Sequence, residues 1–383
     1  MSTPSFVSLG AQRRRHGVTG IGTSHFVRSR DGTRIGYLSV GTGPPVLVIP
    51  GVLSMAADYA AFALALAGRF TVHTIERRGR GESGPQGDDY SIVKECEDVL
   101  ALQAETGAAF LVGHSYGGLV ALEVARNNKA FSKIAVYEPG VSIDGSMPTA
   151  WMPGYEKKLS EKRNVDALVE FTLADAPPRI QKMPPWLMKL LLLVLVSCSR
   201  QYRQMVDLLD QNLREWREIA RLDNSCEHYR EINGGVLLMY GGRSDSEAVT
   251  LATERLAAIL PHSVTKEFPS LDHFGIERTA PREVADVVSD YFCIQRFADV
   301  AKWIGAENCV RPRNVATALM AILQPRPGDP PIEPACWARS VDERRRSQGC
   351  GVTAFTRRVS ASTRQNSRRR LRSVAPIPGY LPA

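Results

Sequence analysis

Five short apolar segments, each ended by a turn, most strongly constrain how this 383-residue chain folds. Most of them are followed by a stretch with helical periodicity. Strands that are apolar on both faces are typical of parallel sheets covered by helices on either side. We therefore predict an α/β fold with a mostly parallel central sheet. The segments are "VLVIPG" (46–51), "FTVHTIE" (70–76), "AAFLVGH" (108–114), "KIAVYEP" (133–139) and "GVLLMYGG" (235–242).

This alternation stops between residues 141 and 232, where proline, tryptophan and long helical runs prevail, and it resumes afterwards. We predict a helical cap over this stretch and an α/β core made of residues 23–140 and 233–293. A polar, glycine-rich arm (1–22) precedes the core, and a tail rich in arginine and proline (294–383) follows it. Their composition predicts a flexible arm and a disordered tail.

The formal net charge of +8 belongs to the predicted tail. Residues 294–383 carry 16 basic and 6 acidic side chains, a net of +10, and the rest of the chain has a net of −2. Two arginine clusters there could attract phosphate, but they lack interleaved aromatic residues and a folded nucleic-acid motif. We therefore expect no specific nucleic-acid binding.

Seven scattered cysteines without a C-x-x-C pattern predict reduced thiols and a cytoplasmic protein. We expect no metal and no cofactor. The longest apolar run, 190–196, is about half of a membrane span, so no transmembrane segment is predicted. The sequence does not indicate an oligomeric state.

A serine between two glycines, in "FLVGHSYGGLVAL" (110–122), is the strongest candidate for a catalytic group. A G-x-S-x-G motif between a strand and a helix places the serine on a sharp turn, where only small residues fit two positions on either side. Ser115 would be the nucleophile, with Gly113 and Gly117 at the crowded positions. The alternative is a glycine-rich turn that carries a surface serine.

A serine nucleophile needs a histidine base and a carboxylate that orients it, in the order serine, acid, histidine for this architecture. His273, in "FPSLDHFG" after the last strand, is the predicted base; otherwise it is a solvated loop residue. Asp245, in "GGRSDSEA", is the favoured acid, although it could instead cap a helix. Glu138 and Asp144, which follow an earlier strand, are the competing acids.

An oxyanion formed at this serine would need two N–H donors. The Tyr116 amide, at the start of the following helix, is the first. The second should come from the loop after residues 46–50, and we favour the Val52 amide, with Leu53 as its alternative.

These motifs together resemble the α/β-hydrolase fold family, over about residues 24–292. They are "VIPG", "IERRGRGESG", "GHSYGG", "GGRSD" and "DHFG", in the order the family has them. Two residues depart from its pattern, since Pro50 stands where histidine is usual and Glu76 where aspartate is usual. The resemblance implies a cofactor-independent serine hydrolase of the esterase, lipase or perhydrolase kind.

The expected function is cleavage of an ester, thioester or related acyl bond of a small, apolar substrate through an acyl-enzyme at Ser115. One alternative on the same fold is a perhydrolase or acyltransferase, in which another acceptor replaces water. The other is a non-catalytic binding protein with a basic tail.

One segment of the predicted cap, "PPWLMKLLLLVLVSCSR" (184–200), is apolar nearly all round as a helix. Such a helix could line an acyl pocket or lie against a membrane surface. The favoured interpretation is a core helix of the cap, packed on both sides.

Overall fold

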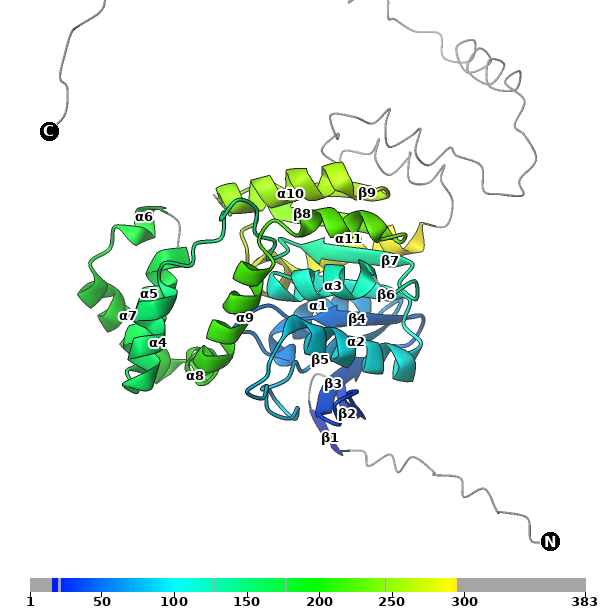
Figure 1. Cartoon of the computed structure of the whole chain (residues 1–383). Coiled ribbons are helices and arrows are strands. Elements are labelled where there is room, and N and C mark those ends of the chain that lie inside the picture. Colours follow the sequence, from blue (N-terminus) through cyan, green and yellow to red (C-terminus); the bar gives the residue numbers. More distant parts are fainter. Residues whose placement is uncertain (1–15, 20–21, 127, 176–177, 245, 295–383) are drawn as a thin grey trace, which may run out of the picture. The chain divides into compact units, whose positions relative to one another are not determined.

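The computed structural model describes residues 16–19, 22–126, 128–175, 178–244 and 246–294. Within these residues, nine strands form a single sheet in the order β1-β2-β3-β5-β4-β6-β7-β8-β9 (Figure 1). The first three strands and β5 pair antiparallel, and all pairings from β5 through β4 to β9 are parallel, as the sequence predicted. The strands are β1 (His16–Thr19), β2 (Gly22–Arg28), β3 (Arg34–Val40), β4 (Pro45–Ile49), β5 (Thr71–Ile75), β6 (Phe110–His114), β7 (Lys133–Tyr137), β8 (Gly235–Gly241) and β9 (Ser263–Phe268).

Each face of the sheet has its own apolar core, because successive side chains of a strand point to opposite faces. In β4, Leu47 and Ile49 join one core, and Val46 and Val48 join the other. The first core includes buried residues of α2 (Ile92–Thr106), α3 (Tyr116–Arg126) and α10 (Glu247–Ile259). The second includes those of α1 (Ala60–Leu66) and α11 (Pro281–Cys293).

Among the described residues, six α-helices and one 3-10 helix (Cys226–Glu231) lie between β7 and β8, within the stretch where the sequence predicted a cap; we call residues 141–232 the helical segment (Figure 1). Its two ends are held together, since the Asn224 amide donates to the Ser142 carbonyl at 3.1 Å and the Ser142 hydroxyl donates to Asp223 at 2.5 Å. The α-helices are α4 (Met152–Ser160), α5 (Asn164–Asp175), α6 (Pro178–Gln181), α7 (Pro185–Cys198), α8 (Arg200–Asp207) and α9 (Leu209–Arg221).

The structure differs from the sequence-based expectation at one place near the N-terminus. Residues 16–19, within the predicted flexible arm, form β1, because β2 offers them an unpaired sheet edge. Further along, a short 3-10 helix begins at Ala56, and the hydroxyl of the nearby Ser54 donates to Glu277 at 2.9 Å. Apart from Ile294, the predicted tail lies outside the described residues.

A buried ion network joins the helical segment to the core. The guanidinium of Arg77, in the turn after β5, lies 3.0 Å from Glu95 of α2 and 2.8 Å from Glu215 of α9. Arg80 lies 2.8 Å from the same Glu215, and all four side chains are almost fully buried. Burial by itself would lower the pKa of Arg77. The negative charges of Glu215 and Glu95 outweigh this effect, so the pKa is raised well above its usual value. Arg77 therefore stays charged, and its contact with Glu215 ties α9 to the turn after β5.

Removing one partner of a buried ion pair leaves an uncompensated charge, which costs about 3–5 kcal/mol. We expect Glu215→Gln to lower the free energy of unfolding in urea by that amount. Glu156→Gln is the matched control, because its partner Arg217 lies 2.7 Å away and both side chains are about half exposed. The control should change the stability by less than about 1 kcal/mol. Equal effects of the two substitutions would contradict the prediction.

Candidate active site

The turn from β6 into α3 requires both of its flanking glycines. Ser115, between the two elements, has a φ of 52°, a left-handed conformation that costs energy for a residue with a side chain. A Cβ atom at Gly113 would lie 2.4 Å from the Gly117 carbonyl oxygen, and one at Gly117 would lie 2.2 Å from that of Ile49. These contacts are too close for any side chain, so the turn that presents Ser115 has the sharpness that the motif predicted.

The loop after β4 lies directly beside this turn. A Cβ atom at Gly51 would be 3.1 Å from that of Ser115, so residue 51 must stay small. Leu53 has a positive φ of 53°, so backbone strain is present in this loop as well as at the serine. Tyr116 is the first residue of α3, where amides have no acceptor within the helix. The loop and the helix start are thus neighbours of Ser115, and the Val52 and Tyr116 amides stay predicted oxyanion donors.

His273 follows β9, and two buried aromatic side chains hold its backbone against the sheet. The carbonyl of His273 accepts a hydrogen bond from Nε2 of His114, the residue before Ser115, at 2.9 Å. The preceding carbonyl, of Asp272, accepts from the Tyr137 hydroxyl at 2.7 Å. The imidazole rings of His114 and His273 lie 4.7 Å apart, and the His273 side chain is 37% exposed. The predicted base therefore lies next to the serine turn and is accessible.

A buried carboxylate lies at Nδ1 of this imidazole. Glu138, directly after β7, has Oε2 2.7 Å from His273 Nδ1, and its side chain has no exposed surface. Its Oε1 accepts from the Gly241 amide at 2.8 Å and from the Ser244 hydroxyl. Its positive φ of 43° directs the chain away from the regular strand. Both carboxylate oxygens thus have donors, as a buried anion needs.

The other candidate acids have different positions. Asp245, the acid favoured from the sequence, lies outside the described residues, next to Ser244, which donates to Glu138. Asp144 lies on an exposed turn, where its amide donates to Asn224. Asp272, the chain neighbour of His273, is not one of these candidates: it accepts from the Phe274 amide and the Thr279 hydroxyl and so organises its own loop. Of the candidate acids that the structure describes, Glu138 is the one at hydrogen-bond distance from the imidazole.

A buried chain of hydrogen bonds links the loop after β4 to the base. The Gly51 amide donates to the Tyr59 hydroxyl at 3.0 Å, and this hydroxyl lies 2.5 Å from Nδ1 of His114. The other nitrogen of His114 contacts the His273 carbonyl. Burial and the neighbouring His273 lower the pKa of His114 well below its usual value. His114 is therefore neutral, with a hydrogen on Nε2, and accepts from Tyr59.

Arg77 supports the same two loops from the other side. Its Nη1 donates to the Gly51 carbonyl at 2.9 Å, and its guanidinium lies 4.7 Å from the centre of the Tyr116 ring. The Tyr116 hydroxyl is 2.8 Å from that of Tyr90, which donates to Glu95. The buried ion network thus holds both predicted oxyanion donors in place.

The sequence does not reveal the positioning roles of Tyr59, His114 and Arg77. It shows the arginine turn only as part of a family motif. A buried hydrogen bond between residues far apart in the chain leaves no periodic signal that could have revealed them. Among the described residues, no group of histidine, cysteine, aspartate and glutamate could hold a metal ion.

Comparison with known proteins agrees with this fold. Residues 46–287 match the model of the alpha/beta hydrolase family. The chain is 27% identical to an alpha/beta hydrolase from Sphaerobacter thermophilus, with a TM-score of 0.60 over 70% of this chain and 100% of that one. It is 17% identical to an esterase from Thermogutta terrifontis (TM-score 0.55; 70% and 97% covered). It is 20% identical to a deformylase from Pseudomonas putida S16 (TM-score 0.51; 69% and 99%). The chain belongs to the alpha/beta hydrolase family, and this membership supports a hydrolytic function.

The role of the Tyr59 hydroxyl can be tested by removing a single oxygen atom. We expect Tyr59→Phe to lower the free energy of unfolding by about 1–3 kcal/mol, because the Gly51 amide loses its acceptor and His114 loses its donor. Tyr240→Phe is the control, since the Tyr240 hydroxyl makes a 3.3 Å contact with Glu267 at a half-buried position. Urea unfolding measures both. A Tyr59→Phe protein as stable as the control would disprove the role of this hydroxyl.

Proposed function

We propose that this protein is a serine hydrolase that cleaves an ester, thioester or related acyl bond through an acyl-enzyme at Ser115. The observation that carries the proposal is the 2.7 Å contact between the exposed imidazole of His273 and the fully buried carboxylate of Glu138, beside the strained turn of Ser115. A serine, an imidazole and a carboxylate in this arrangement are the parts that nucleophilic acyl transfer needs.

In the proposed mechanism, the Ser115 hydroxyl oxygen attacks the acyl carbonyl while Nε2 of His273 takes its proton. Glu138 accepts the hydrogen bond from Nδ1 and stabilises the imidazolium. The Tyr116 and Val52 amides would donate to the oxyanion; losing one such donor typically lowers turnover by about 10²–10³. The imidazolium then gives its proton to the leaving group. In the second half, His273 takes a proton from water, which attacks the acyl carbonyl. The imidazolium then returns a proton to the Ser115 oxygen as its bond to the acyl carbon breaks and the acid leaves.

Glu138 is our proposed acid because of its contact with Nδ1, and Asp245 stays the alternative from the sequence. The carboxylate of Glu138, which follows β7, extends past the end of β8 to the imidazole. The Gly241 amide, at the end of β8, donates a hydrogen bond to this carboxylate. This donor and the Ser244 hydroxyl both bond Oε1 of Glu138, which leaves Oε2 directed at the imidazole.

The helical segment is our proposed cap, and its packing supports an apolar substrate. The core that contains Leu53 and Tyr116 continues without a break into Trp151, Phe171 and Trp216 of the helical segment. Five partly buried methionines pack on this core, and such flexible side chains adapt to irregular apolar groups. They are Met55, Met147, Met152, Met183 and Met205.

The nucleophile can be tested with a fluorophosphonate probe, which reacts with activated serines. We expect the wild-type protein to be labelled and to hydrolyse a short-chain chromogenic ester. Ser115→Ala should abolish both, because no other group would attack. Ser83→Ala is a suitable control, since the Ser83 hydroxyl is bonded to the Glu76 carbonyl in another loop. Equal labelling of wild type and Ser115→Ala would rule out the proposed acyl-enzyme.

The two candidate acids can be separated by isosteric substitution. We expect Glu138→Gln to lower kcat by up to about 10⁴, the effect of leaving a catalytic histidine in the wrong tautomer. Asp245→Asn should lower it far less. Both variants should still react slowly with the probe at Ser115, which keeps this result distinct from loss of the nucleophile. The reverse ranking would assign the acid to Asp245 and leave Glu138 as a structural carboxylate.

A further inference from the structure

Helix α7 is apolar and exposed, in contrast to the core helix that the sequence favoured. Only Met188 and Leu192 of α7 are buried, and these two side chains pack into the apolar core that the rest of the helical segment shares. The helix contacts α5 and α8 and lies on the side of the helical segment away from the sheet (Figure 1). Six large apolar side chains of α7 are exposed: Trp186 (70%), Leu187 (39%), Leu190 (54%), Leu191 (45%), Leu193 (43%) and Val194 (53%).

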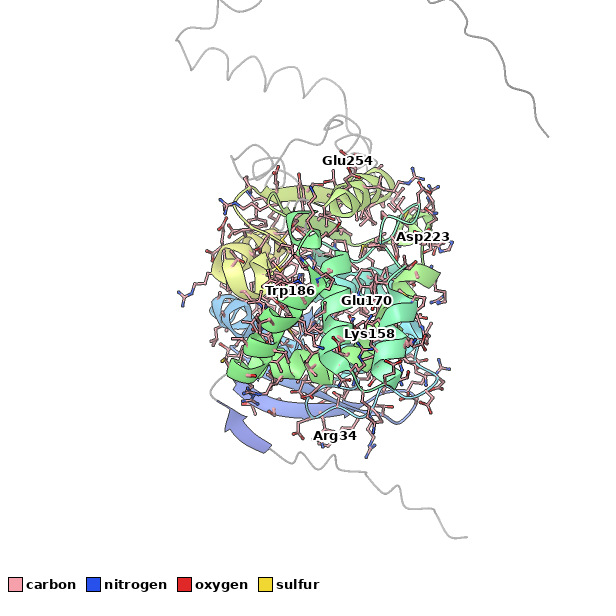
Figure 2. All side chains as sticks on the ribbon, turned by 90° about the vertical axis from the view of Figure 1, so that its left-hand side faces the viewer. Arg34, Lys158, Glu170, Trp186, Asp223 and Glu254 are labelled. Carbon is pink, nitrogen blue, oxygen red and sulfur yellow. The ribbon has the colours of Figure 1, made fainter. Side chains whose placement is uncertain are left out.

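These six side chains form one continuous stripe, which we call the α7 face. At 100° per residue they fall within an arc of roughly 160°, and the buried Met188 and Leu192 lie on the opposite side. Trp186 is labelled on the side of the molecule that faces the viewer in Figure 2. Single exposed apolar residues are ordinary, but a stripe of six on one helix marks a surface that is covered in use.

The charged side chains of the stretch of sequence that contains α7 have one sign. Between Asp175 and Asp207 the sequence contains no acidic residue. Among the side chains of this stretch that the structure describes, the exposed basic ones are Lys182, before the helix, and Arg200 and Arg203, after it. Arg203 also donates to the Val196 and Ser197 carbonyls at the end of α7, which keeps its charge at this position.

Two acidic side chains of the neighbouring α5, Asp166 and Glu170, are paired with cations. Asp166 lies 2.7 Å from Lys189 and 3.2 Å from Arg163, and Glu170 pairs with Lys158. Lys189, on α7 itself, is therefore neutralised. The basic side chains at the two ends of α7, Lys182, Arg200 and Arg203, produce a positive electrostatic potential around the α7 face. This potential attracts an anionic surface.

We propose that the α7 face docks onto the surface of an anionic lipid bilayer. A helix that places tryptophan and leucines on one side, with basic residues at its ends, is suited to lie in the plane of the headgroups with its apolar side among the acyl chains. No helix among the described residues is long and apolar enough to cross a membrane, so the contact would be peripheral. The proposal does not depend on the chemistry at Ser115.

The test uses the full-length protein in flotation with vesicles of phosphatidylcholine alone or mixed with phosphatidylglycerol. We expect stronger binding to the mixed vesicles, weakened by salt, and a blue shift of tryptophan emission that Trp186→Phe removes. Leu190→Ser/Val194→Ser should weaken binding at least about tenfold, because two apolar side chains no longer enter the bilayer. Lys182→Glu/Arg200→Glu should abolish the preference for the mixed vesicles.

Leu64→Ser/Val93→Ser is the matched control, since Leu64 of α1 and Val93 of α2 are 52% and 58% exposed. It should bind like the wild type, and circular dichroism checks that all variants are folded. No binding to mixed vesicles would overturn the proposal. So would equal binding by wild type and Leu190→Ser/Val194→Ser, which would assign the attraction to the basic tail. A third outcome would also overturn the proposal: the wild type binds no vesicles but self-associates in sedimentation, and Leu190→Ser/Val194→Ser abolishes this self-association. The α7 face would then be a contact between copies of the chain.

Discussion

The buried guanidinium of Arg77 connects the parts of the molecule on which the site depends. It donates to the Gly51 carbonyl, covers the Tyr116 ring, and pairs with Glu95 of α2 and Glu215 of α9. A cation without solvent is tolerated only when its partners are present, so these elements stabilise one another cooperatively. The position of the predicted oxyanion loop and the attachment of the helical segment are therefore coupled through one side chain.

A second set of contacts fixes the base relative to the nucleophile. Tyr137 and His114 donate to the consecutive carbonyls of residues 272 and 273, and both donors come from the ends of neighbouring parallel strands. His114 can do this because burial lowers its pKa well below the usual value and leaves it neutral. The loop that carries His273 is thus held by the sheet itself, and the groups that we propose for catalysis are positioned before any substrate binds, which is the condition for electrostatic preorganisation.

Much of the fold was predictable because it rests on local patterns. The apolar strands, the serine turn and the position of His273 follow from periodicity and from motifs of a few residues. The contact between Glu138 and His273 did not, since a carboxylate at the end of either β7 or β8 satisfies the same sequence order, and only spatial distance distinguishes them. The exposure of α7 was also unpredictable: a helix apolar on all sides carries no periodic signal that tells a buried face from an exposed one. The paired charges at Arg77 and Glu215, 138 positions apart, left no mark in composition.

The two ends of the helical segment meet at Ser142 and Asn224, so this long insertion leaves the sheet and returns to it at nearly one point. An element attached in this way can change its length without altering strand register, because the strands on either side need only the same short closure. Its sequence is constrained at Glu215, whose contacts with Arg77 and Arg80 hold α9 to the turn after β5. Exchanging residues 143–222 among relatives while keeping this carboxylate is therefore the natural way to redirect such a scaffold toward new substrates.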